Sequence, residues 1–217
     1  LWLAASHTLH AESIFGVGIG INATWYRADN SGEQHFNSYL LPHYQLDYLH
    51  KNEQGFCAGA GIGCTVRQVP FTGTSHKDRT GVQLSEWWLR VRSGFMWDDK
   101  HGSSLLYLAL GLGRDAHFSL YSKNAAQMYY QNANALDTLY RMHQVQPFAE
   151  IGLERFREKQ ILPGLSGGWS IACRIYPLPL YPHPLHVEFA YQDFHDIQYH
   201  LLEAMATFHF HFRHSRY

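Results

Sequence analysis

Apolar and polar residues alternate along most of this chain. In residues 13–27 every second side chain from Phe15 to Trp25 is apolar, and three of the residues between them are glycine. Successive side chains of a β-strand point to opposite sides, so this segment is predicted to be a strand with one apolar face. The same period of two recurs to the C-terminus. The pattern therefore predicts an all-β protein.

We predict nine strands from this alternation. They cover residues 13–27, 36–50, 56–66, 86–97, 103–113, 143–154, 169–175, 186–192 and 202–212. Short turns alternate with longer loops, which is typical of an antiparallel up-and-down barrel, and a closed bacterial barrel has an even number of strands.

An additional strand within residues 114–138 would give ten strands, and omission of the segment near Val187 would give eight. We favour ten, because the alternation near Val187 is clear. Residues 13–217 are expected to form a single β-barrel domain. Residues 1–12 are either a remnant of a signal peptide or an ordinary N-terminal segment.

The composition limits the classes of function. Charged residues make up 16% of the chain and the formal net charge is −1, which argues against nucleic-acid binding, since that requires clustered Lys and Arg. The longest apolar run, residues 105–110, is far shorter than the roughly 20 residues of a membrane-spanning helix. Any crossing of a membrane must therefore use strands.

The content of the two strand faces indicates which side meets lipid. A soluble β-sandwich or a lipocalin turns its apolar face inward, whereas a transmembrane barrel turns it outward. Here the polar face is rich in glycine and carries few charges per strand, and the lysines lie almost wholly in turns and loops. Aromatic residues gather toward the strand ends, as in interfacial girdles. We therefore expect the apolar face to contact lipid.

The charged residues of the polar face are expected to pair across a narrow lumen, where glycines leave room for them. This predicted lumen network consists of Asp47, Arg67, Glu86, Arg90, Arg92, Glu150, Glu154, Arg174, Glu188 and Glu203.

The alternating strands, the rhythm of short turns and long loops, and the closing run from Ala206 to Phe212 give the chain a resemblance to the small bacterial outer-membrane β-barrels, loosely of the OmpX and PorT-like kind. The resemblance implies the outer membrane of a Gram-negative bacterium, contact with its lipid, and an aromatic signal for the barrel assembly machinery at Phe208, Phe210 and Phe212. Such proteins commonly stop at the final aromatic residue, whereas residues 213–217 follow here, so either Phe212 or Tyr217 is expected to take the part of that residue.

The sequence nominates no enzyme site, metal site or cofactor. His209 and His211 share one strand face, but no third metal ligand accompanies them, and we expect them to bond to Glu203 or Glu188. The pairs Ser75–His76 and His117–Ser119 have no catalytic motif around them. Among the three cysteines, Cys57 and Cys64 lie on opposite faces, and Cys64 could reach Cys173 only across adjoining strands.

An eight- or ten-stranded barrel has little free lumen once side chains fill it. We therefore expect a barrel with a plugged lumen, which anchors or assists a larger envelope complex through contacts with other envelope proteins. The alternatives are an outer-membrane lipid-modifying enzyme, a narrow pore and a soluble lipocalin-like carrier.

Overall fold

The computed structural model describes residues 12–28, 34–70, 81–121, 145–178, 187–189, 192–194 and 199–215. The strands are β1 (Glu12–Ala28), β2 (Gln34–Lys51), β3 (Phe56–Pro70), β4 (Gly81–Asp99), β5 (Gly102–Tyr121), β6 (Val145–Leu162), β7 (Leu165–Ile175), β8 (Val187–Phe189), β9 (Gln192–Phe194) and β10 (Tyr199–Ser215). No helix able to span a membrane occurs among these residues. The proposed signal-peptide remnant lies almost entirely outside the described residues.

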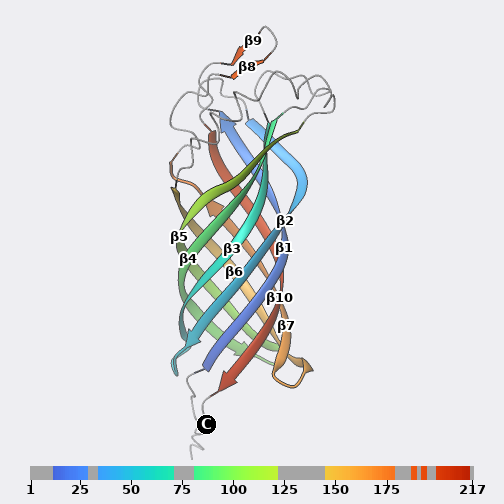
Figure 1. The fold of residues 1–217 in the computed structure, drawn as a ribbon. Helices are drawn as coiled ribbons and strands as arrows, with labels where there is room; N and C mark the ends of the chain where they lie inside the picture. The colour runs from blue at the N-terminus through green and yellow to red at the C-terminus, as the bar shows by residue number, and fades with distance from the viewer. Residues whose placement is uncertain are drawn as a thin grey trace, which may run out of the picture.

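Eight of the strands form a closed antiparallel barrel in the order β1-β10-β7-β6-β5-β4-β3-β2. Figure 1 shows the tilted strands of the barrel wall. β8 and β9 form a separate two-stranded sheet. The count falls within the predicted range of eight to ten, but the preference for ten is wrong. β10 pairs directly with β7 and β5 pairs directly with β6, which leaves no place in the wall for a strand between either pair.

The barrel is long enough to cross a bilayer. Its strands contain 11 to 20 residues, whereas a tilted transmembrane strand requires about 9–11. The three connections 52–55, 100–101 and 163–164 lie at one end of the barrel, which we call the turn end. The opposite end, where longer stretches of sequence connect the strands, is the loop end.

Turn chemistry explains the short connections at the turn end. The Asn52 side-chain oxygen accepts hydrogen bonds from the backbone N–H groups of Gln54 and Phe56, at 3.0 and 2.9 Å. Gly55 and Gly164 have φ angles of 85° and 78°, in the left-handed region that other residues rarely adopt. The Asn52 side chain and these glycines therefore allow adjacent strands to be joined by short connections of two to four residues.

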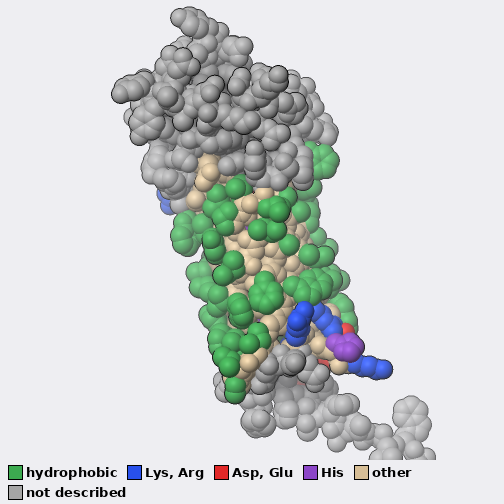
Figure 2. Space-filling model, turned by 90° about the vertical axis from the view of Figure 1, so that its right-hand side faces the viewer, with side chains coloured by type: hydrophobic (Ala, Val, Ile, Leu, Met, Phe, Trp, Pro, Cys, Tyr) green, Lys and Arg blue, Asp and Glu red, His purple; other side chains and the backbone are tan. Residues whose placement is uncertain are grey.

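The apolar face of the wall points outward. Leu89 and Leu108 are 55% and 64% exposed, whereas Arg90 and Glu150 are each only 2% exposed. Figure 2 shows apolar side chains covering the barrel wall on the side in view. Water would be a poor solvent for so large an apolar belt, and a soluble carrier would place these leucines inside. The soluble lipocalin-like alternative is therefore wrong.

Aromatic side chains flank the belt near the turn end. Within four residues of the turn-end limits of their strands, seven outward aromatic side chains are exposed: Phe15, Tyr48, Phe56, Phe95, Trp97, Trp169 and Phe212. Trp25 lies three residues from the loop-end limit of β1 and is exposed as well. This distribution matches the interfacial girdles of transmembrane barrels.

Candidate functional site

The lumen holds most of the charge that the structure describes in the barrel wall. Nine of the ten residues of the predicted network have inward side chains that are at most 4% exposed: Asp47, Arg67, Glu86, Arg90, Arg92, Glu150, Glu154, Arg174 and Glu203. Glu188 is on β8, outside the barrel sheet, and the structure does not describe its side chain. The nine residues form three connected groups along the barrel, all of which pair opposite charges.

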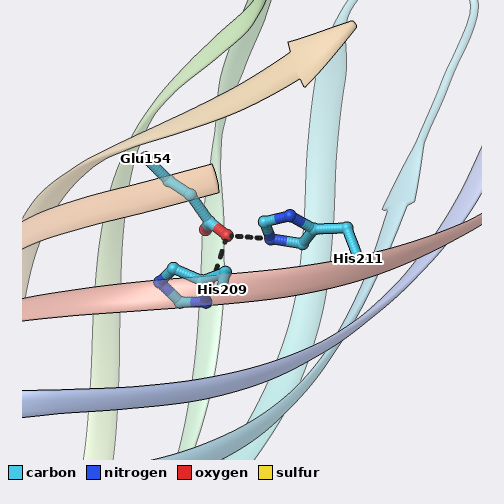
Figure 3. Close-up of side chains that lie close together, drawn as sticks. All are labelled: Glu154, His209 and His211. Atoms are coloured by element: carbon cyan, nitrogen blue, oxygen red, sulfur yellow. Dashed lines mark hydrogen bonds and ion pairs between the residues drawn. The ribbon is translucent and has the colours of Figure 1, made fainter. Parts of the chain in front are cut away.

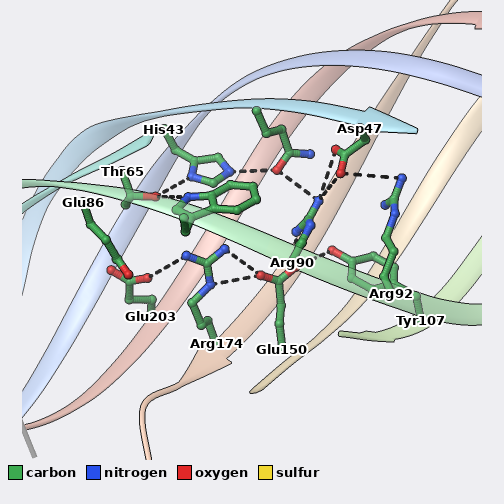
Figure 4. A network of polar contacts seen from close by, with 12 residues as sticks. His43, Asp47, Thr65, Glu86, Arg90, Arg92, Tyr107, Glu150, Arg174 and Glu203 are labelled. Atoms are coloured by element: carbon green, nitrogen blue, oxygen red, sulfur yellow. Dashed lines mark hydrogen bonds and ion pairs between the residues drawn. The ribbon is translucent and has the colours of Figure 1, made fainter. Parts of the chain in front are cut away.

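The central group is built around Arg90 and Glu150. One nitrogen of Arg90 donates to both carboxylate oxygens of Asp47, at 2.9 and 3.1 Å, and another donates to Glu150. Arg174 donates two further hydrogen bonds to Glu150, at 3.0 and 2.8 Å, and the hydroxyl of Tyr107 donates a fourth, at 2.9 Å. Figure 4 shows this network. Glu150 is thus shared by two guanidinium groups.

The second group lies toward the loop end. Arg67 forms ion pairs with Glu86 and Glu203. The hydroxyl of Tyr176 lies 2.8 Å from Glu86 Oε2 and donates to it. Arg174 lies 3.8 Å from Glu203 and links this group to the central one. Glu86 therefore pairs with Arg67, and it is not the partner of Arg90.

Inward aromatic residues fill the space beside these charges. Trp88 donates its indole N–H to Thr65, at 3.0 Å, and the guanidinium of Arg174 lies 4.0 Å from the ring centre of Phe148. A Cβ atom at Gly63 would collide with the Trp88 ring, and one at Gly111 would collide with Phe148. These aromatic residues were not among the predicted lumen residues, although Trp88 lies an even number of residues from the inward charges on β4 and therefore on the same face.

The third group lies toward the turn end and includes two histidines. Arg92 donates to Glu154 Oε2 at 2.6 Å, and the other carboxylate oxygen of Glu154 lies 2.8 Å from His211 Nε2 and 3.7 Å from His209 Nδ1. Figure 3 shows both rings directed toward this oxygen. The expectation that the histidines bond to Glu203 is wrong, because the register of β10 places them at the height of Glu154 and Glu203 pairs with Arg67. The side chain of Glu188, the other expected partner, lies outside the described part of the structure.

A hydroxyl, an imidazole and a carboxylate lie next to one another here, as in the catalytic triad of a hydrolase. They belong to Ser170, His209 and Glu154. Ser170 Oγ lies 2.7 Å from His209 Nε2. However, Ser170 is only 5% exposed, so an acyl substrate does not reach its hydroxyl in this conformation. The pairs Ser75–His76 and His117–Ser119 lie outside the described side chains.

An apolar cluster fills the lumen beyond the third group. Its buried members include Ile14, Leu49, Met96, Leu105 and Phe156, each at most 2% exposed. These residues lie on the same inward face of their strands as the charged groups, but near the turn end this face is apolar. They were not among the residues predicted from the sequence. The cluster separates the charged groups from the turn end.

None of the three cysteines forms a disulfide. A bond between Cys64 and Cys173 is excluded, because β3 and β7 are not neighbours in the barrel.

No protein-family model and no curated protein matches the chain. Among solved structures, it is similar to Ail, the attachment invasion locus protein of Yersinia pestis, with a TM-score of 0.46, 11% identity and coverage of 94% of this chain and 99% of that one. It is also similar to Neisserial surface protein A, with a TM-score of 0.48, 6% identity and coverage of 91% and 96%. With eight antiparallel strands, an apolar exterior and a charged interior, the protein has the architecture of a small outer-membrane β-barrel of Gram-negative bacteria.

Proposed function

We propose that the protein is a membrane anchor with a closed lumen, which serves as an accessory subunit of an envelope complex. The observation that supports closure best is the series of buried ion pairs from Arg67 to His211, in which each carboxylate contacts a guanidinium group from a different strand. An eight-stranded barrel has an interior just wide enough for its side chains.

The energetics of these pairs oppose opening. A solute could pass only if several ion pairs separated, and loss of one partner from a buried pair costs about 3–5 kcal/mol. The apolar cluster around Phe156 adds a second barrier that contains no charge. Two barriers of different chemistry make a permanent pore a poor candidate function.

The accessory role is supported by the pairing of the charged side chains in the lumen. The charged groups that an enzyme or a transporter would offer to a ligand are engaged with one another. The outer wall and the loop end are then the surfaces available to partners. The barrel supplies a stable lipid-embedded base for them.

Planar lipid bilayers test closure. We expect no discrete conductance steps from the purified wild-type barrel. A wide porin reconstituted in the same bilayers is the control for detection, because its lumen is an open aqueous channel. Regular steps from the wild-type barrel, absent from bilayers without protein, would contradict a closed lumen.

Native extraction tests the accessory role separately. The chain carrying an affinity tag is extracted from its own membranes in mild detergent and separated by native electrophoresis. We expect it in an assembly larger than the barrel, which dissociates in stronger detergent into the barrel and defined partners. Migration as a solitary barrel under all mild conditions would refute the accessory role and leave the closed lumen untouched.

A further inference from the structure

The turn-end group brings together three side chains that commonly bind metals. Glu154 comes from β6, and His209 and His211 come from β10. One potential ligand atom from each lies within 4.8 Å of the others, and all three residues are 1% exposed. Two imidazoles and one carboxylate are the ligand set of many zinc sites. The sequence showed only the two histidines, because the third ligand is 57 residues from His211.

We propose that Glu154, His209 and His211 bind a divalent transition-metal ion, with Zn²⁺ as the best-suited ion. The ligand atoms of a tetrahedral zinc site lie roughly 3.3 Å apart, given bonds of about 2.0–2.1 Å. Glu154 Oε1 is 2.8 Å from His211 Nε2 and 3.7 Å from His209 Nδ1, which brackets that spacing. The three ligand atoms lie within 4.8 Å of one another, so they have to approach each other on binding, and water takes the fourth position.

Neighbouring groups hold the ligands as metal sites require. Ser170 Oγ lies 2.7 Å from His209 Nε2 and accepts its proton in a hydrogen bond, which leaves Nδ1 unprotonated, 3.7 Å from Glu154 Oε1 and 3.5 Å from the side-chain nitrogen of Gln45. Arg92 holds the second carboxylate oxygen of Glu154 at 2.6 Å, so that the first is directed toward the imidazoles. Such supporting hydrogen bonds orient ligands and raise metal affinity.

The charges beside the ligands are compatible with a bound cation. Arg92 contacts both Glu154 and Asp47, so its positive charge is matched by two carboxylates. Asp47, 3.9 Å from Arg92, moderates the repulsion between that arginine and the ion.

Zinc analysis of the refolded barrel tests the proposal. The protein is unfolded with a chelator, refolded in detergent with or without Zn²⁺, freed of loose ions and analysed for bound metal by mass spectrometry. We expect about one zinc ion per wild-type chain, at least tenfold weaker binding in His209→Ala and His211→Ala, and about tenfold weaker binding in Ser170→Ala, which lacks only the supporting hydrogen bond. Co²⁺ in place of Zn²⁺ should give the visible absorption of a tetrahedral site.

The matched control is His43→Ala, which removes another lumen histidine, also 1% exposed. His43 reaches His209 only indirectly, through Gln45, so the variant should keep most of the zinc binding. Folding of every variant is verified by heat-modifiable electrophoretic migration. If a histidine variant does not fold, Glu154→Gln replaces it. No zinc bound to the folded wild type, or equal binding by wild type and His211→Ala, would overturn the proposal. Neither outcome bears on closure of the lumen.

Discussion

At the scale of single residues, stability depends on how completely each buried charge is matched. Removing a charge from water is costly, and it is tolerated only where opposite charges and hydrogen bonds replace the lost hydration. Arg90 contacts Asp47 and Glu150, and Glu150 also contacts Arg174. Substitution of one of these residues therefore leaves more than one buried charge without a partner. The central group is therefore more sensitive to substitution than any exposed pair.

Arg90→Ala should lower the free energy of unfolding by about 3–5 kcal/mol, because Asp47 loses its closest cation and Glu150 loses one of two. Urea unfolding in lipid vesicles measures this loss. The matched control is Arg155→Ala, which removes an exposed partner of Asp99 at the turn end. The hydrogen bond from Arg155 lowers the pKa of Asp99, so that pair is fully charged at neutral pH.

We expect the control to change stability little, since exposed ion pairs contribute little. Equal losses in the two variants would contradict a special role for the buried pair.

At the scale of strands, glycine on the inner face decides which large side chains fit opposite. β3 alternates outward residues such as Ala60 and Ile62 with inward Gly61 and Gly63. The inward glycines leave the space that Asp47 and Trp88 occupy. The small residues of one strand are therefore matched to the large residues of its neighbours.

Gly63→Leu should destabilise the barrel by about 3 kcal/mol or prevent folding, because the added side chain meets the Trp88 ring and the wall of β2. Ala60→Leu is the control on the same strand, since Ala60 points outward and a longer apolar side chain there meets lipid. Urea unfolding of both variants checks this expectation. A more harmful effect of Ala60→Leu would show that the faces of β3 are misassigned.

The C-terminal strand carries the proposed assembly signal, which remains a prediction. Phe212→Ala should slow insertion by the assembly machinery several-fold without a matching change in the stability of the finished barrel. Phe15→Ala is a close control, because Phe15 pairs with Phe212 across β1 and β10 and is similarly exposed, 46% against 50%. Assembly rates in reconstituted vesicles distinguish them. Equal slowing would mean that both act through lost apolar contact alone.

At the scale of the whole molecule, the barrel reverses the distribution of apolar and charged side chains that is found in a soluble protein. Its apolar side chains are outside and its charges are inside, so the surrounding solvent has to be lipid. Closure also satisfies the backbone groups of every barrel strand, which is necessary where no water is present. Stability of the molecule therefore depends on the membrane as much as on the lumen.

Leu108→Arg should lower stability in a bilayer by about 2–4 kcal/mol, because Leu108 is 64% exposed within the apolar belt and an arginine there enters hydrocarbon. Leu108→Phe, which keeps the position apolar, should be nearly neutral. Unfolding in vesicles and heat-modifiable migration measure both. A fully stable Leu108→Arg variant would indicate that this face meets water.

Much of the site could be predicted from the alternation of side chains along each strand, which assigns every second residue to the same face. The alternation assigned Arg90 and Glu150 to the inner face, and the structure places both there. The alternation gives no information on the height of a residue along the barrel. From the sequence, Glu86 and Glu150 were therefore equally good partners for Arg90, and Glu203 or Glu188 was expected beside the histidines, whereas the structure pairs Arg90 with Glu150 and His211 with Glu154. The alternation also left the inward apolar cluster at the turn end unrecognised, because the period of two continues there unchanged.

The sequence by itself determined that the chain forms strands with two different faces, because side-chain direction follows from a local period of two. The composition of those faces, with glycine and few charges on the polar one, indicated which side meets lipid. Only the tertiary structure decided that eight strands close the barrel and that Glu154 lies beside His209 and His211. Those outcomes depend on which strands pair and in what register. Strand pairing and register are set by closure of the whole sheet, which no single strand specifies.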